Sequence, residues 1–378
     1  MTRDATRDAT PSFGTFFLPG PTEVRPEILA AMTRPMIPHR GADFERLFAR
    51  LQDGMRSVFK TTRPVLVSSS SATGLMEAAV RCAPPGAVLS LVNGAFSERF
   101  ANIARACGRD TEVLEVPLGA VPPLDDVAAR LRARRFVAVT VVHSETSTGA
   151  LTDVRALTTL AREHGTLCLV DSVTGVGGTP LHFDQWELDF VLTGSQKALA
   201  LPPGLALGVA SEAYMKTARE APGRGLYFDL VEFESFALRN QTPNTPALPL
   251  LYALDAQLER VAQETIEGRW ARHAAMAART HEWAAEREDT HGIGVLARPG
   301  TRSHTVTAIT LPDGVSGGQV VRAAAARGFT VGGGYGALRE RTFRIGHMGD
   351  HTLGTLERCL AVCDAALGEL RGRSPDPA

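Results

Sequence analysis

The sequence has almost no net charge and few cysteines. Its 378 residues include 40 Lys or Arg and 41 Asp or Glu, which leaves a formal net charge of -1. This balance gives no electrostatic reason to expect nucleic acid or an anionic membrane as a partner. The five cysteines contain no C-x-x-C pair, and an odd number in a chain of this size is typical of reduced thiols. We therefore expect a cytoplasmic protein whose partners are small molecules.

Long hydrophobic runs are also absent. No apolar stretch approaches the roughly 20 residues that a membrane-spanning helix needs, so we expect no membrane partner. Residues 1–15 repeat Thr-Arg-Asp-Ala-Thr and have no apolar core of the kind found in signal peptides, so we expect a disordered lead-in there. Cys359 and Cys363 are the only cysteines spaced to meet on one helix face, and with no His nearby we expect no metal site.

A regular alternation of β-rich and helical segments fills the chain from about residue 64 to residue 211. The β-rich segments, such as AVLSLV, FVAVTVV and TLCLVD, are short and largely apolar, and helical patterns rich in Ala, Leu and Arg separate them. Such strands are typical of a mostly parallel sheet that helices cover on both faces, so the fold class is α/β. Ligands of these sheets bind at the carboxyl ends of the strands, and the residues there are the candidates for a site.

The pattern changes in the last third of the chain. A helical periodicity without proline runs from Leu250 to about Arg287 and predicts one long connecting stretch. The strands and helices that follow it suit a smaller C-terminal α+β domain. We expect a large domain over residues 16–262 and a small domain over residues 263–378.

A lone lysine, Lys197, stands in the apolar segment LTGSQKALALPPG. An ammonium group held among apolar residues loses hydration, its pKa falls, and the neutral amine becomes a nucleophile toward aldehydes. Lys197 is therefore a candidate to bind an aldehyde cofactor as a Schiff base. The alternative is a lysine whose stem lies along the surface while its charged head reaches water.

Asp171 and a serine-rich turn extend this candidate site. Asp171 closes the strand TLCLVD, where a carboxylate could keep the ring nitrogen of pyridoxal 5'-phosphate protonated. It could instead cap a turn or a helix. Ser71, Ala72 and Thr73 follow a strand and open a helix in SSSSATGLMEAAV, a place suited to bind a phosphate. Ordinary helix capping is the alternative for this turn.

Two further strand ends supply an aromatic ring and a hydroxyl. Phe96 follows the strand AVLSLV and could stack on the cofactor ring, although it could also belong to the core. Thr146, in VVHSETSTG, could bond the phenolic oxygen of the cofactor, while His143 and Glu145 beside it could form only a polar loop. The agreement of several strand ends favours a pyridoxal-phosphate site more strongly than any of these residues alone.

These residues belong to motifs that resemble the class V, fold-type I pyridoxal-phosphate enzymes, and within them the alanine-glyoxylate and serine-pyruvate aminotransferase branch. FLPGPTEVRPEILAAM resembles the N-terminal P-G-P segment of the branch, GSQKALALPPG its lysine motif, HSETSTG its S-T-G loop and FRIGHMG its R-I-G segment. The resemblance covers about residues 16–370. It implies the fold-type I architecture, pyridoxal 5'-phosphate as cofactor, and a homodimer with shared active sites.

The resemblance also implies roles for individual residues. Lys197 would bind the cofactor covalently, Asp171 would pair with its ring nitrogen, and Arg344 would bind the substrate α-carboxylate. The role of Arg344 also has a chemical basis independent of the resemblance, since a guanidinium binds a carboxylate through two parallel hydrogen bonds. The other cofactor contacts that the resemblance implies are Ser71, Thr73, Phe96, Thr146 and Gln196 of one chain, with Thr242 and Thr245 of the neighbouring subunit.

The expected function is transamination with ping-pong kinetics through pyridoxamine phosphate. The donor is a small L-amino acid, alanine or serine, with aspartate as a third candidate, and the acceptor is a 2-oxo acid such as glyoxylate or pyruvate. Arg40 or Arg341 could supply a second cation for a distal carboxylate. The alternatives are a cysteine desulfurase or related lyase, which needs a mobile cysteine near the substrate, and a non-catalytic scaffold that kept the fold.

Overall fold

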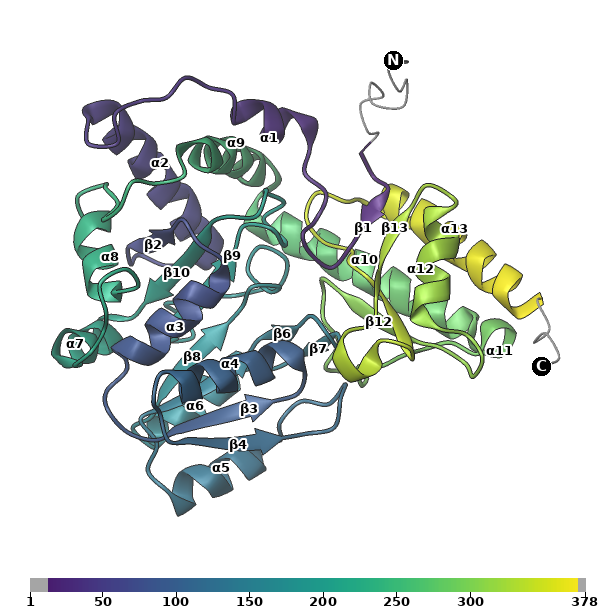
Figure 1. Ribbon diagram of the computed structural model, residues 1–378, viewed down its shortest axis with the longest axis horizontal. Helices are drawn as coiled ribbons and strands as arrows, with labels where there is room; N and C mark the ends of the chain where they lie inside the picture. The colour runs from purple at the N-terminus through teal and green to yellow at the C-terminus, as the bar shows by residue number, and fades with distance from the viewer. Residues whose placement is uncertain (1–12, 373–378) are drawn as a thin grey trace, which may run out of the picture.

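The computed structural model describes residues 13–372, so most of the lead-in predicted for residues 1–15 lies outside the described residues. A seven-stranded sheet forms its larger part (Figure 1). All neighbouring strands are parallel except at one strand, which is antiparallel to both of its neighbours. The mostly parallel sheet is therefore confirmed. In spatial order its strands are β2 (Val65–Ser68), the antiparallel β10 (Ala206–Ala210), β9 (Phe190–Gly194), β8 (Leu167–Asp171), β5 (Ala138–Val142), β3 (Val88–Val92) and β4 (Thr111–Glu115).

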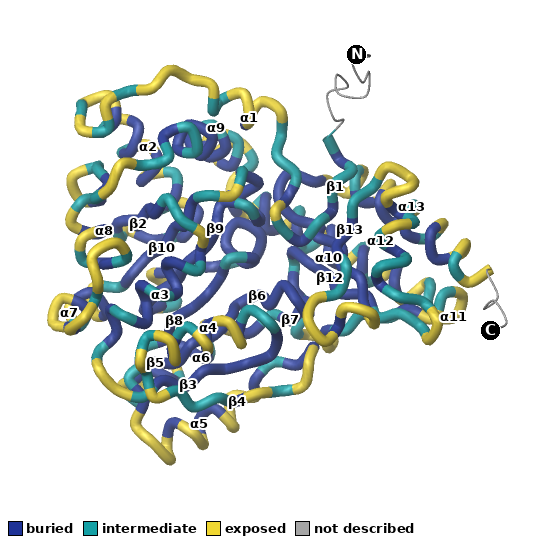
Figure 2. Tube along the Cα trace, in the orientation of Figure 1, coloured by how far each residue is buried: buried dark blue, intermediate teal, exposed yellow. Residues whose placement is uncertain are grey.

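Helices cover both faces of this sheet, and the strands between them are buried (Figure 2). Side chains of a strand alternate between the two faces: in β5, Val139 and Val141 belong to one hydrophobic cluster and Ala138 to the other. Burial on both sides explains why these strands are apolar throughout. On one face lie α2 (Ala42–Phe59), α5 (Leu124–Ala133), α6 (Val154–Glu163) and α9 (Leu248–Glu264), and on the other α3 (Ala72–Cys82), α4 (Ala95–Ala106), α7 (Glu212–Glu220) and α8 (Leu230–Ala237).

A second, five-stranded sheet forms the smaller α+β part. One of its strands comes from the N-terminus and pairs in parallel with a strand more than three hundred positions later. Its strands, in spatial order, are β1 (Phe16–Phe17), β13 (Thr330–Gly333), β14 (Thr342–Ile345), β12 (Thr307–Thr310) and β11 (Gly294–Val295). The helices packed on it are α10 (Ile266–Glu286), α12 (Gly317–Ala325) and α13 (Leu353–Gly372). Shorter elements are α1 (Pro26–Ala31), α11 (Glu288–His291) and the hairpin of β6 (Ser144–Glu145) and β7 (Ala150–Leu151). The boundaries 16–262 and 263–378 stay a prediction.

The helical stretch predicted from Leu250 to Arg287 is two helices, α9 and α10. Thr265 separates them with a φ of 65°, outside the range of a right-handed helix. Its hydroxyl accepts a hydrogen bond from the Gly268 N–H at 3.1 Å and caps α10. The prediction of one continuous helix was wrong because the apolar spacing continues across the break and no proline marks it.

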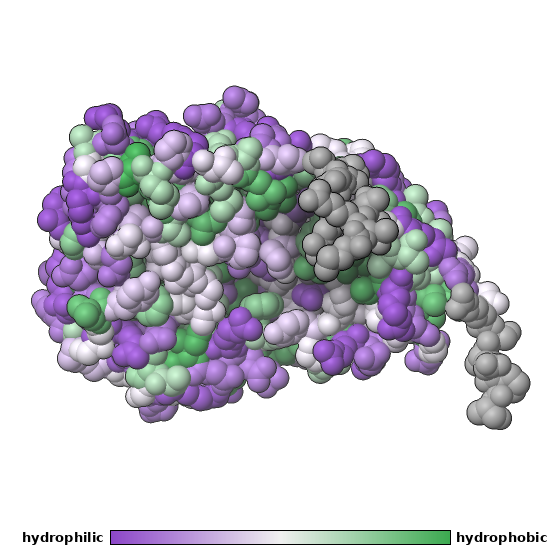
Figure 3. Space-filling view, turned by 45° about the horizontal axis from the view of Figure 1, so that its top comes forward, coloured by the Kyte–Doolittle hydropathy of each residue, from purple (hydrophilic) through white to green (hydrophobic). Residues whose placement is uncertain are grey.

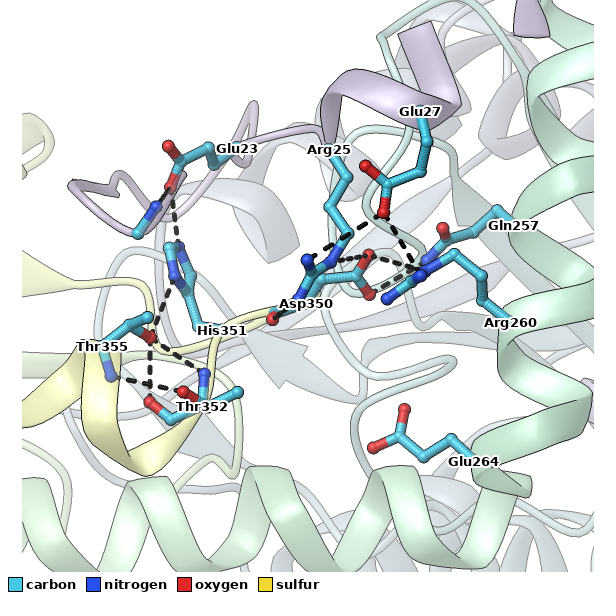
Figure 4. Close-up of polar contacts among 12 residues, drawn as sticks. Glu23, Arg25, Glu27, Gln257, Arg260, Glu264, Asp350, His351, Thr352 and Thr355 are labelled. Carbon is cyan, nitrogen blue, oxygen red and sulfur yellow. Dashed lines mark hydrogen bonds and ion pairs between the residues drawn. The ribbon is translucent and has the colours of Figure 1, made fainter. Parts of the chain in front are cut away.

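Buried ion pairs hold the segment between β1 and α1 against the rest of the molecule, and Figure 4 shows Arg25, Gln257 and Arg260 converging on Asp350. Arg25 Nε lies 3.3 Å from Asp350 Oδ2. The other carboxylate oxygen of Asp350 accepts a bond from Gln257 at 3.0 Å and pairs with Arg269 at 2.9 Å. Because these partners come from the N-terminal segment, α9 and α10, Asp350 joins three elements that are distant in sequence.

Within residues 13–372, no helix has both the length and the apolar character needed to cross a membrane. The same part of the chain contains no group of three or more His, Cys, Asp or Glu residues arranged to hold a metal ion. All five cysteines are free thiols, and Cys107 alone among them is not fully buried.

Candidate active site

A cavity of about 110 Å³ lies at the carboxyl ends of β5, β8 and β9. The sheet brings its lining together from segments that are far apart in sequence. Predicted site residues in the lining are Ser71, Ala72, Thr73, Phe96, Thr146, Asp171, Gln196 and Lys197. The rest of the lining consists of Met76, Arg99, Val142, Ser144, Val173 and Thr174.

Lys197 is the buried amine of this cavity. Lys197 is only 6% exposed, and its Nζ donates a hydrogen bond to the carbonyl of Pro19. Nζ also lies 5.7 Å from the centroid of the Phe96 ring. The pKa of Lys197 is lowered to about 8, mainly by burial and next by the charge of Arg344, while the charge of Asp171 acts in the opposite direction. The alternative of a surface lysine therefore does not hold.

The loop after β9 can bury this lysine because its own polar groups are satisfied. The Ser195 hydroxyl donates to the carbonyl of Pro202 at 2.7 Å and folds the loop back on itself. Thr22, from the N-terminal segment, donates its N–H to the Gln196 carbonyl at 3.0 Å and its hydroxyl to the Lys197 carbonyl at 3.1 Å. An apolar loop whose carbonyls are paired in this way can lie inside the protein at little cost.

Asp171 is the buried carboxyl group of the cavity. It ends β8, and its Oδ1 accepts a hydrogen bond from the Val173 N–H at 2.8 Å. Burial raises the pKa of Asp171 to about 7, although that hydrogen bond lowers it. A cation beside the carboxylate would favour its ionised form, and a protonated pyridine nitrogen is such a cation. A buried carboxyl and a buried amine lining one cavity therefore fit pyridoxal 5'-phosphate.

The N-terminus of α3 forms a further wall. Ser71 is the N-cap residue of α3, and its hydroxyl makes no capping bond. The first helical hydrogen bond runs from the Gly74 N–H to the Ser71 carbonyl, so the N–H groups of Ala72 and Thr73 precede it. Uncommitted N–H groups and hydroxyls at a helix N-terminus suit a phosphate.

Glu145 positions Phe96 and was not predicted as part of the site. This fully buried carboxylate accepts hydrogen bonds from the N–H groups of Phe96 at 3.1 Å and Ser97 at 2.9 Å, which places a negative charge at the N-terminus of α4. The Ser147 hydroxyl donates another bond to it at 2.6 Å. Reading Glu145 as part of a polar loop was therefore wrong.

Thr146, the next residue, lines the cavity, and its hydroxyl makes a hydrogen bond with that of Thr174.

Arg344, the predicted carboxylate-binding residue, lies beside this cavity. It belongs to β14; its Nε donates to the Gly333 carbonyl at 2.8 Å and its Nη1 to the Thr146 carbonyl at 3.1 Å. Burial lowers the pKa of its guanidinium, and Arg344 takes part in none of the ion pairs within residues 13–372. A fixed guanidinium without a carboxylate partner is available to an anionic substrate.

Thr242 and Thr245 do not line the cavity of their own chain. They lie in a separate hollow together with Ser69 and Tyr227. The Thr242 hydroxyl donates to the Asn244 carbonyl at 2.8 Å. This position agrees with the expectation that they serve a neighbouring subunit, which stays a prediction.

Neither Arg40 nor Arg341, the two candidates for a second cation, lines the cavity, whereas Arg99 does. Arg40 donates to the carbonyls of Thr242 and Pro243, at 2.6 and 3.1 Å, while Arg341 is exposed and does not line the cavity. Arg99 does line it, one helical turn beyond Phe96 on α4. The i, i+3 spacing of these two residues was the signal that could have revealed it.

Comparisons with known proteins extend over both sheets. The sequence matches the family described as Aminotransferase class-V over residues 27–338. It is 32% identical to the L-aspartate–glyoxylate aminotransferase of Paracoccus denitrificans, over 94% of this chain and 91% of that protein. With the serine–glyoxylate aminotransferase of Methylorubrum extorquens it shares 33% identity, over 88% of this chain and 86% of that one. The crystal structure of an alanine–glyoxylate aminotransferase from Nostoc sp. has a TM-score of 0.86 to this chain at 30% identity, over 94% and 95% of the two chains.

Proposed function

The chain belongs to the class-V aminotransferases, which are pyridoxal-phosphate-dependent enzymes, and on this premise we propose that it transfers the amino group of a small L-amino acid to a 2-oxo acid. Candidate donors are alanine, serine and aspartate, and candidate acceptors are glyoxylate and pyruvate. The relatives named above are aminotransferases of aspartate, serine and alanine with glyoxylate, which supports this choice. The observation that carries the proposal is the buried Lys197, which shares its cavity with Asp171.

We propose that the lining residues hold the cofactor at three points. The Lys197 amine would bind its aldehyde carbon, Asp171 would pair with the ring nitrogen, and the N-terminus of α3 would take the phosphate. Phe96 would cover the ring, with Thr146 and Gln196 beside it, because all of these residues line the same cavity. When bound, the cofactor supplies an electron sink that stabilises negative charge on the substrate Cα.

Lys197 would also move the proton of the reaction. Its Nζ would take the proton from the substrate Cα, which requires a neutral amine. The lowered pKa of Lys197, about 8, leaves a useful fraction of neutral amine near neutral pH. Arg344 would bind the α-carboxylate, and its bonds to Gly333 and Thr146 would hold the guanidinium in one orientation.

Neither alternative function is favoured. A desulfurase needs a cysteine next to the substrate, but none of the five cysteines lines the cavity, and Cys359 and Cys363 are buried in α13. If the protein were a non-catalytic scaffold, the unpaired guanidinium of Arg344 and the perturbed pKa values of Lys197 and Asp171 would have no role.

The test is an absorption spectrum of the purified protein before and after addition of alanine, serine or aspartate. We expect a visible cofactor band that a donor removes and that glyoxylate or pyruvate restores. Lys197→Ala should lower the turnover number by about 10²-fold or more, because it removes the general base. Lys216→Ala, at an exposed lysine on α7, is the matched control. Wild-type turnover in the Lys197→Ala protein would contradict the assignment.

We further propose that the protein is a cytoplasmic homodimer. Its free thiols support a reducing compartment. The position of Thr242 and Thr245 outside the cavity supports a shared site. Three large hydrophobic residues are strongly exposed: Met36 by 70%, Leu226 by 90% and Leu238 by 67%. Figure 3 shows hydrophobic groups interspersed with hydrophilic ones on one face of the molecule. Sedimentation equilibrium should give twice the mass of one chain, and a monomer that retains full turnover would contradict the shared site.

A further inference from the structure

We infer that Arg99 and Tyr335 bind the side-chain carboxylate of a dicarboxylic amino donor, so that the enzyme prefers aspartate or glutamate to alanine or serine. The inference rests on the proposed function and selects among its donors. It is carried by Arg99, which lines the cavity that holds Lys197, by Tyr335, which contacts Arg99, and by Arg344, which lies beside the ring of that tyrosine.

Arg99 is the cation that reaches the cavity from α4. It lines the cavity together with Lys197 and Asp171, yet its residue remains exposed, so a ligand can approach it. Its guanidinium carbon lies 4.9 Å from the centroid of the Phe96 ring. Stacking on this ring holds the flexible arginine side chain in place and leaves its edge free for hydrogen bonds.

Tyr335 joins Arg99 to the residue expected to bind the α-carboxylate. The Tyr335 hydroxyl lies 3.5 Å from Arg99 Nη2, and its ring stacks with that of Phe96 at 5.6 Å between centroids. The guanidinium carbon of Arg344 lies 5.7 Å from the centroid of the same tyrosine ring. One cation therefore contacts the ring of Tyr335 and the other its hydroxyl.

Among the described residues, neither guanidinium has a carboxylate within ion-pair distance. Burial lowers the pKa of Arg344, and the charge of Glu145 acts in the opposite direction. None of the ion pairs within residues 13–372 includes Arg99 or Arg344; the hydrogen bonds of Arg344 go to backbone carbonyls and that of Arg99 to a hydroxyl. Arginine carries five N–H donors, and both groups keep donors to spare. Two cations that lack an ion-pair partner in the described part of the chain, next to one cavity, match a ligand with two carboxylates.

The discrimination follows from the use of both cations. A dicarboxylic donor bound to Arg344 through its α-carboxylate can extend its second carboxylate to Arg99 and accept a hydrogen bond from the Tyr335 hydroxyl. Alanine and serine leave Arg99 without a partner, so they gain less binding energy in the same orientation. Loss of a hydrogen bond to a charged group changes affinity by about 10- to 100-fold.

The first test measures binding without chemistry. Succinate has two carboxylates and propionate one, and neither has an amine that can react. Calorimetry on the cofactor-loaded enzyme should show succinate binding at least about tenfold more tightly than propionate. Arg99→Gln should abolish this preference. Arg132→Gln, which removes an exposed cation from α5, outside the cavity, should retain it. Equal affinities in the wild type, or a preference retained by Arg99→Gln, would overturn the inference.

The second test uses donors in turnover. The ratio of kcat/KM for L-aspartate or L-glutamate to that for L-alanine should fall about tenfold or more in Arg99→Gln, mainly through KM, and by a smaller factor in Tyr335→Phe. An equal loss for all donors would mean that Arg99 only supports Phe96, and would overturn the inference. A wild-type preference for alanine would do the same. Absence of the cofactor band and of turnover with every donor would instead contradict the proposed function.

Discussion

Lys197 and Asp171 are buried ionisable groups whose pKa values move toward neutrality from opposite directions. Burial lowers the pKa of the lysine to about 8 and raises that of the aspartic acid to about 7. Each group thus has a substantial population of both charge states between pH 7 and 8 before the cofactor binds. The same residues that bind the cofactor therefore control how fast it is captured.

We predict that cofactor capture depends on pH with a midpoint near 8. The amine of Lys197 must be neutral to attack an aldehyde, and its neutral fraction increases as pH rises through its pKa. The rate at which the cofactor-free protein gains the visible band should therefore rise between about pH 7 and 9 and then level off. Lys216→Ala should give the same profile. A rate that continues to rise toward the ordinary lysine pKa of about 10.4 would contradict the prediction.

The residues at the ends of strands could be predicted because a parallel sheet places its functional groups there. Lys197, Asp171 and Thr146 were found in this way and line one cavity. Arg99 lies inside a helix rather than at a strand end, and only its i, i+3 spacing from Phe96 on α4 connects it to the cavity. Glu145 was noticed without a role, since its contact with the N-terminus of α4 joins two segments about fifty positions apart.

At the scale of elements, the N-terminal segment and the lysine loop meet at Gly20. This glycine has a φ of 116°, where other residues are strained, and a Cβ built on it would lie 2.5 Å from both Cε and Nζ of Lys197. The adjacent Pro19 carbonyl accepts the hydrogen bond from Nζ. The segment can lie over the amine only because residue 20 has no side chain.

Gly20→Ala should therefore weaken cofactor binding, which we would measure as the fraction of protein with the visible band during titration with pyridoxal phosphate. Gly108→Ala is the matched control: Gly108 also has a positive φ, 75°, but a Cβ there would meet nothing within 4 Å. Both variants incur the backbone strain, and only Gly20→Ala adds the clash with Lys197. Equal cofactor affinity in the two variants would contradict this account.

The strands were predictable at this scale, and the break between α9 and α10 was not. Strands such as β5 and β9 are buried on both faces, so their sequences are apolar throughout and stand out from the helices. Thr265 caps α10 with a positive φ, a conformation that threonine rarely adopts, and the nearest glycine, Gly268, lies inside α10 rather than at the break. Helical spacing alone cannot reveal such a break.

At the scale of the whole molecule, Asp350 is the residue that holds distant elements together. Its carboxylate lies among Arg25, Arg260 and Arg269, and both Asp350 and Arg269 are almost fully buried. Burial raises the pKa of Asp350, but Arg269, the hydrogen bond from Gln257 and the charge of Arg260 together keep it below its usual value. Removing its charge takes from the buried Arg269 one of its two carboxylate partners and leaves it only Glu264, at 3.1 Å.

We predict that Asp350→Asn lowers the free energy of unfolding by about 3–5 kcal/mol, the usual cost of breaking a buried pair. Urea denaturation of the cofactor-loaded protein would measure it. Asp43→Asn removes the partner of Arg46 in an ion pair whose side chains are both about two-thirds exposed, and should change stability by less than about 1 kcal/mol. Similar losses in the two variants would show that Asp350 contributes no more than a surface charge.

The overall architecture could be predicted only in part. Alternating strands and helices indicate the large sheet, and the change of pattern near α10 indicates the smaller unit. The place of β1 could not be predicted, because a two-residue strand carries no periodicity and its partner β13 lies near the other end of the chain. Contacts between such remote segments depend on the completed fold.

The pairing of β1 with β13 has a consequence for biosynthesis. The first described residues of the chain are made long before their partners: His351 Nε2 donates a hydrogen bond to the Phe16 carbonyl at 3.0 Å across 335 positions, and β1 pairs with β13. Until those residues emerge, the strand that leads to Pro19 has nothing to dock on, and Lys197 lacks its cover. The site can therefore be completed only after β13 has been made, and a chain that ends before residue 330 should not capture the cofactor in its finished geometry.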